Sequence, residues 1–227
     1  MVDCRVCGFC HIIFYLATCV VKQRSMSFVI FDTEYTTWEG CLKNGWHGSQ
    51  KQEIVQIAAL KVDDDFNVVA EFNQLCQPKI NPILSDYFVN LTGISNDDVA
   101  QKGVDFALAY QRFKAFVGND VCYSHGWKGV FKDACDGAIL AENLRLYGLP
   151  ADNSVKYRNI AALFKQVYQK YNVAVSSQSS GQICKILGLQ QQLADLHLDE
   201  HNALYDVYSI LCGVRHFAGD FAILKQK

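Results

Sequence analysis

Hydrophobic residues near the start of the folded region gather in three short runs that predict β-strands. The runs cover residues 27–34, 53–62 and 68–75, and a polar turn at residues 63–65 separates the second from the third. Strands joined in this way are typical of an antiparallel meander. The longer connection between the first two strands, residues 35–51, has the length of a functional loop.

Helical spacing dominates the rest of the chain. Apolar residues recurring three or four positions apart predict helices around residues 106–117, 139–147, 160–167, 183–187 and 203–214. A short apolar run at residues 121–124 predicts one further strand. A meander followed by alternating helix and strand predicts an α/β fold, with a mixed sheet flanked by helices.

Composition agrees with one folded domain. Half of the 227 residues are hydrophobic and only three are prolines, which argues against disorder. A formal net charge of −2 argues against a protein that coats nucleic acid, but not against an enzyme that grips a few nucleotides with the help of bound cations. Ten cysteines, mostly scattered singly, indicate free thiols in a reducing cytoplasm.

Residues 1–25 form a cysteine-rich apolar extension. Its motif, C-x2-C-x2-C-H, consists of Cys4, Cys7, Cys10 and His11. Zinc sites usually pair two such clusters, so a metal knuckle is disfavoured. The uncharged run is shorter than the roughly 20 residues of a membrane span, and no clear signal-peptide cleavage site follows. We expect the extension to be dispensable or to precede a natural start at Met26, which a folded but inactive chain starting there would refute.

Five residues spread along the chain have the chemistry of one metal-dependent site. They are Asp32, Glu34, Asp136, His201 and Asp206. Asp32 and Glu34 end the first strand two positions apart, so their side chains point to the same side. Asp206 shares the inward face of the last helix with apolar residues. Buried carboxylates are costly unless neutralised, and a pair of divalent cations would neutralise them and cleave phosphodiester bonds.

Oxygen ligands suit Mg²⁺ or Mn²⁺. His201 precedes the last helix, about 7 Å along the axis from Asp206 if the turn is regular. That position suits a residue standing beside a metal and accepting a proton. On spacing alone, a helix-start histidine without chemistry is the competing interpretation.

In combination, these motifs resemble the DEDDh 3′–5′ exonucleases, the superfamily of RNase T and of the proofreading subunit of bacterial DNA polymerase III. Asp32-Thr33-Glu34 matches the first motif, Asp136 the middle acid, and the segment from His201 to Asp206 the H-x4-D motif. Residues 53–57, 91–94 and 143–150 are similar to the Eri-type branch, exoribonucleases that trim RNA 3′ ends. The resemblance covers about residues 27–217.

The resemblance implies an RNase H-like fold, two Mg²⁺ or Mn²⁺ ions, and release of nucleoside 5′-monophosphates from the 3′ end of single-stranded nucleic acid, with RNA favoured. It also implies roles for the five residues. Asp32 would bridge both metals, Glu34 and Asp206 would hold the metal that activates water, Asp136 would support the second metal, and His201 would be the general base.

One departure from the family pattern affects the middle acid. Residues 126–132 intervene like an insertion, which makes Asp133 a rival to Asp136. We favour Asp136 because the family-like helix continues after it. The insertion also brings Trp127, Lys128 and Lys132 near the site, where they could touch single-stranded substrate or form a solvated loop.

Candidates for contacts with the terminal nucleotide surround the end of the first strand. They are Thr33, Tyr35, Thr36, Trp38, Phe88 and Leu91. Trp38 or Trp46 could stack on a base, a contact worth about 1–3 kcal/mol. In the resembling family the region of Phe88 and Leu91 lies near that base, although a buried aromatic is more often core.

These patterns predict three segments: the extension 1–25, an exonuclease domain 26–220 and a tail 221–227. The expected partner is the 3′ end of single-stranded RNA or DNA. No dedicated protein partner is identifiable, membrane association is disfavoured, and a homodimer stays open. The alternatives are a DNA-proofreading or repair exonuclease, a membrane-tethered nuclease, and a catalytically silent nucleic-acid-binding scaffold, against which the intact acid set argues.

Overall fold

A computed structural model describes residues 27–126, 136–176 and 179–225 of the chain. The N-terminal extension with its cysteine motif therefore lies outside the described residues, as do Trp127, Lys128, Lys132 and Asp133. Within the described ranges, no helix has both the length and the apolar character that crossing a membrane requires.

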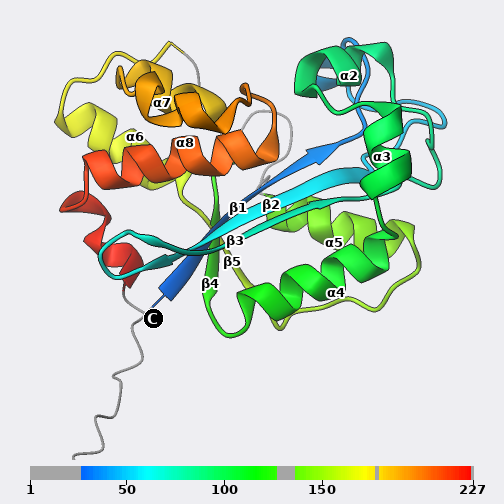
Figure 1. The fold of residues 1–227 in the computed structure, drawn as a ribbon, viewed down its shortest axis with the longest axis horizontal. Helices are drawn as coiled ribbons and strands as arrows, with labels where there is room; N and C mark the ends of the chain where they lie inside the picture. Colours follow the sequence, from blue (N-terminus) through cyan, green and yellow to red (C-terminus); the bar gives the residue numbers. More distant parts are fainter. Residues whose placement is uncertain (1–26, 127–135, 177–178, 226–227) are drawn as a thin grey trace, which may run out of the picture.

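Five strands form one mixed sheet in the order β3-β2-β1-β4-β5 (Figure 1). Their bounds are β1 Ser27–Tyr35, β2 Ile54–Asp63, β3 Val68–Leu75, β4 Val121–Ser124 and β5 Lys156–Asn159. The first three strands pair antiparallel, and β4 and β5 add parallel to β1. The predicted meander within a mixed sheet is confirmed.

Strand burial follows position in the sheet. β1 and β2 are buried on both faces because they lie at its centre, whereas β3 alternates between half-buried and exposed positions as an edge strand does. The opposite edge, β5, was not predicted. Its sequence, Lys-Tyr-Arg-Asn, has one apolar residue in four and carries no hydrophobic pattern.

Eight α-helices and three 3-10 helices are present in the described part of the chain. The α-helices are α1 Cys41–Asn44, α2 Asp86–Thr92, α3 Asn96–Lys102, α4 Phe106–Val117, α5 Asp136–Leu146, α6 Ala161–Lys170, α7 Ile183–Ile186 and α8 Ala203–His216. The 3-10 helices are η1 Ser180–Gln182, η2 Gln190–Leu196 and η3 Asp220–Lys225. The sequence did not resolve α2 and α3, although Ser85 and Ser95 cap their first turns.

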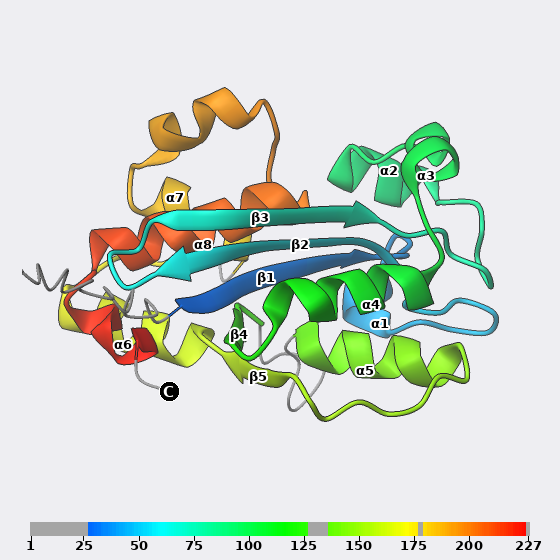
Figure 2. The same cartoon turned by 60° about the horizontal axis from the view of Figure 1, so that its bottom comes forward.

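The helices cover both faces of the sheet, as Figures 1 and 2 show. On one face, Phe28 and Ile30 of β1 pack in a cluster with residues of α6 and α8. On the other face, Val29 and Phe31 pack with residues of α4 and α5. Alternate residues of β1 therefore belong to opposite layers, and the same alternation continues to the end of the strand, where the acids lie.

Two further features lie at the ends of this sandwich. Helices α2 and α3 lie beyond the carboxyl end of β1, over a small core cluster that includes Val55 and Phe88 (Figure 1). At the C-terminus, Phe221 and Leu224 of η3 are buried in the α6–α8 layer. The segment expected to be a tail from residue 221 thus contributes to the core up to Leu224.

Candidate active site

Three of the predicted acids meet on the α8 face of the sheet, at the carboxyl end of β1. Asp32 and Glu34 point to this face, and Asp206 reaches it from the first turn of α8. One carboxylate oxygen from each of the three lies within 4.8 Å of the others. Asp32 and Asp206 are almost fully buried, and Glu34 is half-buried. The three form an all-oxygen donor set that one cation could share.

Asp136 joins this group from the opposite layer. It is the first residue of α5, and one of its carboxylate oxygens accepts hydrogen bonds from the backbone N–H and the hydroxyl of Thr33, at 3.1 and 2.6 Å. Its own N–H donates to the Ser124 hydroxyl at the end of β4, at 3.2 Å. Asp136 is thereby fixed beside Asp32 but outside the group of three.

The electrostatics of the four acids indicate a site built for cations. Burial raises the pKa of Asp32 and Glu34 well above their usual values, and the neighbouring carboxylates raise these pKa values further. Burial raises the pKa of Asp206 to about 7. No ion pair links any of the four acids to a lysine or arginine of the described ranges. Divalent cations fit this donor set because they would neutralise its charge.

The Asp206 carboxylate is oriented by groups that the sequence did not single out. The buried Ser180 hydroxyl of η1 donates to one oxygen at 2.7 Å, and the backbone N–H of His201 donates to the other at 3.3 Å. A Cβ at Gly181 would lie 2.5 Å from the second oxygen, so only glycine allows η1 to approach this closely. Nothing in the serine-rich stretch around Ser180 distinguishes one hydroxyl from its neighbours in the sequence.

His201 lies just outside α8, which begins at Ala203. Its φ of 66° is left-handed, so the estimate of axial distance from a regular helical turn does not describe it. The Asn202 side chain caps α8 by accepting from Leu204 N–H at 3.1 Å. Gln56 of β2 fixes this start, since its side chain accepts from Ala203 N–H at 2.9 Å and donates to Asn202 at 3.2 Å. This role of Gln56 was not foreseen from the sequence.

The six candidates for substrate contact divide into two groups. Thr33, Thr36 and Phe88 are buried and have structural partners: Asp136 for Thr33, the Lys51 carbonyl at 2.5 Å for the Thr36 hydroxyl, and the small core cluster for Phe88. Because the Phe88 ring is fully covered, it presents no stacking surface in this structure. Tyr35, Trp38 and Leu91 are half-buried and keep an exposed edge.

Trp46 packs beside Tyr35, one of these half-buried candidates. Its indole N–H donates to the Thr36 carbonyl at 2.9 Å, and its ring lies 5.8 Å from that of Tyr35. The two rings therefore pack together next to the position of Glu34.

A second histidine, His125, follows β4 and was not considered from the sequence. Its ring packs edge-on against Phe164, and burial lowers its pKa to about 4, so the imidazole is neutral at physiological pH. His125 lines a groove of about 1190 Å³ beside α6 and α7, which also includes Ser179. His125 and Ser179 are the chain neighbours of Ser124 and Ser180, which contact the acids. The acids themselves do not line the groove.

Comparison with known proteins gives one family match. The profile of a family described as Exonuclease (RNase_T) matches residues 29–211. ERI1 exoribonuclease 2 of Xenopus laevis is 32% identical over 90 residues, which is 39% of this chain and 12% of that protein. The Danio rerio protein of the same name is 35% identical over 81 residues, 35% of this chain and 14% of that protein. The chain thus matches only a small part of the length of these curated relatives.

Solved structures show the same fold at low sequence identity. The nuclease domain of 3'hExo, a DEDDh family member bound to rAMP, has a TM-score of 0.62 at 20% identity, covering 87% of this chain and 94% of that one. Cell-death related nuclease 4 has a TM-score of 0.67 at 15% identity, covering 86% and 64%. E. coli Exonuclease I with a dA16 oligonucleotide has a TM-score of 0.62 at 15% identity, covering 87% and 42%. The predicted RNase H-like fold is confirmed.

Proposed function

Since the chain belongs to the exonuclease family whose profile spans residues 29–211, we propose that it is a metal-dependent 3′–5′ exoribonuclease that shortens single-stranded RNA. The observation that carries the proposal is the convergence of Asp32, Glu34 and Asp206 oxygens within 4.8 Å, with Asp136 held beside them. The curated relatives named as exoribonucleases support RNA as the substrate class.

In this proposal the four acids would hold two divalent cations, Mg²⁺ or Mn²⁺. Asp32 would contribute to both, Glu34 and Asp206 to one of them, and Asp136 to the other. When bound, these ions supply polarisation of the scissile phosphate and stabilisation of the leaving 3′ oxygen. Ser180 and Thr33 support the site because their hydrogen bonds keep the Asp206 and Asp136 carboxylates turned toward it.

His201 is the proposed general base, which accepts a proton from the attacking water. Two observations support this role. The residue is half-buried beside the acids rather than enclosed in the core, and its backbone N–H contacts the Asp206 carboxylate. His125 is the weaker candidate because burial lowers its pKa to about 4, and because it lines a groove that the acids do not line.

Three partly exposed side chains form the proposed wall for the terminal nucleotide. Tyr35 and Trp38 follow the acids at the end of β1, and Leu91 lies on α2, which is tied to that segment by a hydrogen bond from the Ser85 hydroxyl to the Thr37 carbonyl, 2.6 Å long. Aromatic faces stack on any base, so this wall suits an enzyme that removes nucleotides of every kind.

The test is degradation of matched 5′-labelled single-stranded RNA and DNA in Mg²⁺, Mn²⁺ or EDTA. The wild-type chain is compared with Asp32→Asn and with Asp65→Asn, which alters an exposed acid in the β2–β3 turn. We expect a metal-dependent ladder that shortens from the 3′ end, is faster on RNA and is lost only in Asp32→Asn. Faster DNA cleavage would indicate an exodeoxyribonuclease. Absence of cleavage by folded protein with cations present would indicate a binding scaffold.

A further inference from the structure

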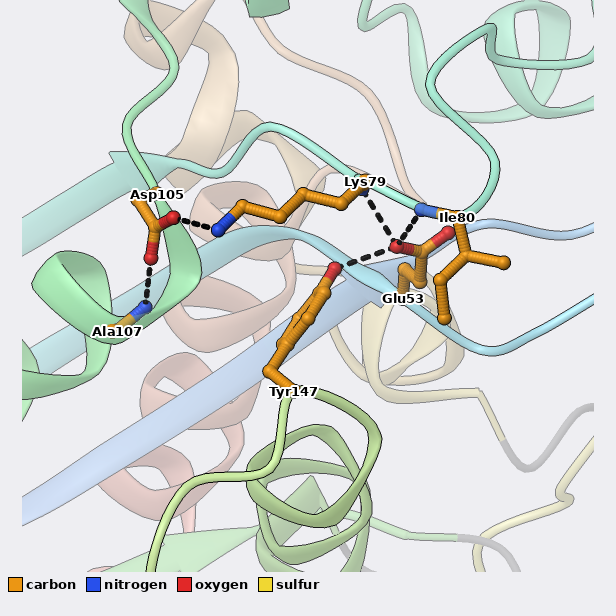
Figure 3. A network of polar contacts seen from close by, with 6 residues as sticks. All are labelled: Glu53, Lys79, Ile80, Asp105, Ala107 and Tyr147. Carbon is orange, nitrogen blue, oxygen red and sulfur yellow. Dashed lines mark hydrogen bonds and ion pairs between the residues drawn. The ribbon is translucent and has the colours of Figure 1, made fainter.

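Glu53 is a fully buried carboxylate that the catalytic proposal does not use. It directly precedes β2 and has no exposed surface. One carboxylate oxygen accepts from the backbone N–H groups of Lys79 and Ile80, at 2.7 and 2.8 Å, and from the Tyr147 hydroxyl at 2.6 Å (Figure 3). The other oxygen accepts from the Asn81 N–H at 2.5 Å. Three consecutive backbone donors thus converge on one side chain.

Burial of a carboxylate costs free energy unless its hydrogen-bond donors stay in place. A carboxylate removed from water needs its lone pairs satisfied, and four donors satisfy those of Glu53. The backbone of residues 79–81 has to hold a fixed conformation so that its N–H groups all face inward. Glu53 therefore determines the path of the chain from β3 toward α2.

The same residue also contacts the end of β1. The Thr36 N–H donates to the Glu53 carbonyl at 2.8 Å, and the Glu53 N–H donates to the Thr36 hydroxyl at 3.0 Å. Thr36 comes two positions after Glu34 of the acid cluster. The backbone of Glu53 thus contacts the end of the strand that carries the acids, and its carboxylate contacts residues 79–81, which lead to α2.

Contacts beyond Glu53 extend this connection. Asn81 accepts from the Lys51 N–H at 3.0 Å and donates to the Ser49 carbonyl at 3.2 Å, so the 79–81 segment also braces the loop that carries Trp46. Leu84 and Phe88 then anchor α2 over the core cluster that includes Val55 of β2. Helix α2 with Leu91, and the loop with Trp46, therefore both follow the position of residues 79–81.

Helix α5 contacts the Glu53 carboxylate through Tyr147, the residue after its last turn, but it also has anchors of its own. The Asn143 side chain donates to the Gln52 carbonyl at 2.8 Å and accepts from the Ile54 N–H at 2.9 Å, on either side of Glu53. Together with the Thr33–Asp136 hydrogen bonds, these contacts hold the acids in place separately. Loss of the Glu53 carboxylate should therefore shift residues 79–81, α2 with Leu91, and the Trp46 loop more than the acids.

We propose that Glu53 is a positioning residue. Through the backbone of residues 79–81, it sets Leu91 on α2 and the Trp46 loop at a fixed distance from the acid cluster. This role rests on the proposed function for its kinetic consequence but on the hydrogen bonds alone for its structural one. It predicts that loss of the Glu53 carboxylate changes KM for RNA more than it changes kcat.

The experiment compares steady-state kinetics on a short single-stranded RNA for wild type, Glu53→Gln and Glu53→Asp. Glutamine places an NH2 group against a backbone N–H, and aspartate keeps the charge but withdraws it by one methylene. Because misplacement of a binding group by about 1 Å is costly, we expect Glu53→Gln to raise KM about tenfold or more, with kcat changed less than about threefold. Glu53→Asp should raise KM by a smaller factor.

Two controls separate positioning from general destabilisation. Lys79→Ala removes a side chain paired with Asp105 but keeps the backbone N–H, and should leave KM unchanged (Figure 3). Val117→Ala weakens the α4 side of the core away from the site, and should lower the melting temperature without raising KM. An unchanged KM in folded Glu53→Gln and Glu53→Asp, or a KM that rises equally in Val117→Ala, would overturn the proposal.

Amide hydrogen exchange tests the structural part without any activity. In Glu53→Gln and Glu53→Asp, the amides of residues 79–81 and 85–92 should exchange faster, while those of β1 and α5 keep their protection. Unchanged exchange at residues 79–81 in both variants would contradict the role of Glu53 even if the wild-type chain proved inactive on RNA. Inactivity with the expected exchange pattern would instead refute only the proposed function.

Discussion

Thr33 donates two hydrogen bonds to a single carboxylate oxygen of Asp136, one from its backbone N–H and one from its hydroxyl. In the alternation along β1, Asp32 and Glu34 lie on the α8 face and Thr33 lies on the opposite face, which α5 covers. Thr33 therefore turns toward α5 because its neighbours turn away from it. Thr33, between Asp32 and Glu34, thus holds Asp136 of the other layer beside them.

Replacing Thr33 tests this recruitment. Thr33→Val keeps the backbone hydrogen bond and the branched shape but removes the hydroxyl, so Asp136 becomes less well oriented. Loss of such a supporting contact typically weakens metal affinity or activity by about 10-fold to 100-fold. The Mg²⁺ concentration that gives half-maximal RNA cleavage should rise accordingly. Thr37→Val is the matched control, because the buried Thr37 hydroxyl has no hydrogen-bond partner in the described part of the chain.

The choice between Asp136 and Asp133 as the middle acid is tested by replacing each with alanine. Asp136 is adjacent to Asp32 electrostatically and is fixed by Thr33, so we expect Asp136→Ala to abolish RNA cleavage. Asp133→Ala should retain it. Rates are measured on the same labelled RNA, with circular dichroism to verify folding. The reverse pattern would transfer the role to Asp133.

His201→Asn separates the imidazole from the backbone that carries it. Asparagine tolerates a left-handed φ, so the N–H that contacts Asp206 should keep its place. Removal of a general base typically lowers kcat by about 10²-fold to 10⁴-fold, and we expect a loss within that range. His197→Asn offers a matched control, since His197 is an exposed histidine with a φ of 51°. An unchanged kcat in His201→Asn would assign the proton transfer elsewhere.

Stability without cations should fall as pH rises. Burial and mutual repulsion raise the pKa values of Asp32, Glu34 and Asp206 in the folded state, that of Asp206 to about 7. A group whose pKa is raised by folding stabilises the folded state while it is protonated, and this contribution is lost as pH rises through the folded pKa. In EDTA, the melting temperature should therefore decrease between pH 6.5 and pH 8.

Mg²⁺ and one variant provide the controls for this pH dependence. Cation binding should raise the melting temperature more at pH 8 than at pH 6.5, because it requires ionised carboxylates. Asp206→Asn should flatten the decrease in EDTA, since the amide can still bond to Ser180 and to the His201 N–H. The range avoids lower pH, where burial of neutral His125, with its pKa of about 4, opposes the trend. A melting temperature independent of pH in EDTA would show that folding does not raise the pKa values of these acids.

Sequence patterns predicted most of the fold because its central elements are strongly apolar. β3 was placed with the observed bounds, and α4 and α8 were recognised from their buried faces. β5 was missed because an edge strand with alternating polar residues has little hydrophobic signal. The buried part of η3 was missed because Phe221 and Leu224 pack through tertiary contacts that no local period reveals.

Within the site, the sequence indicated the acids but not what holds them. Asp32 and Glu34 were expected together from strand geometry alone, and the structure brings Asp206 to them. Ser180 and Gln56 could not be foreseen, since their hydrogen bonds join segments far apart in the chain. Phe88 was proposed for substrate contact by family resemblance, whereas its burial makes it part of the core.

The acids come from segments made at different times. A ribosome completes β1 with Asp32 and Glu34 early, α5 with Asp136 later, and α8 with Asp206 only near the end of this domain. Because domains fold as units once their elements have emerged, the four carboxylates are not yet brought together in a nascent chain that lacks α8. The acid cluster is thus complete only when α8, the last long helix, has packed against the sheet.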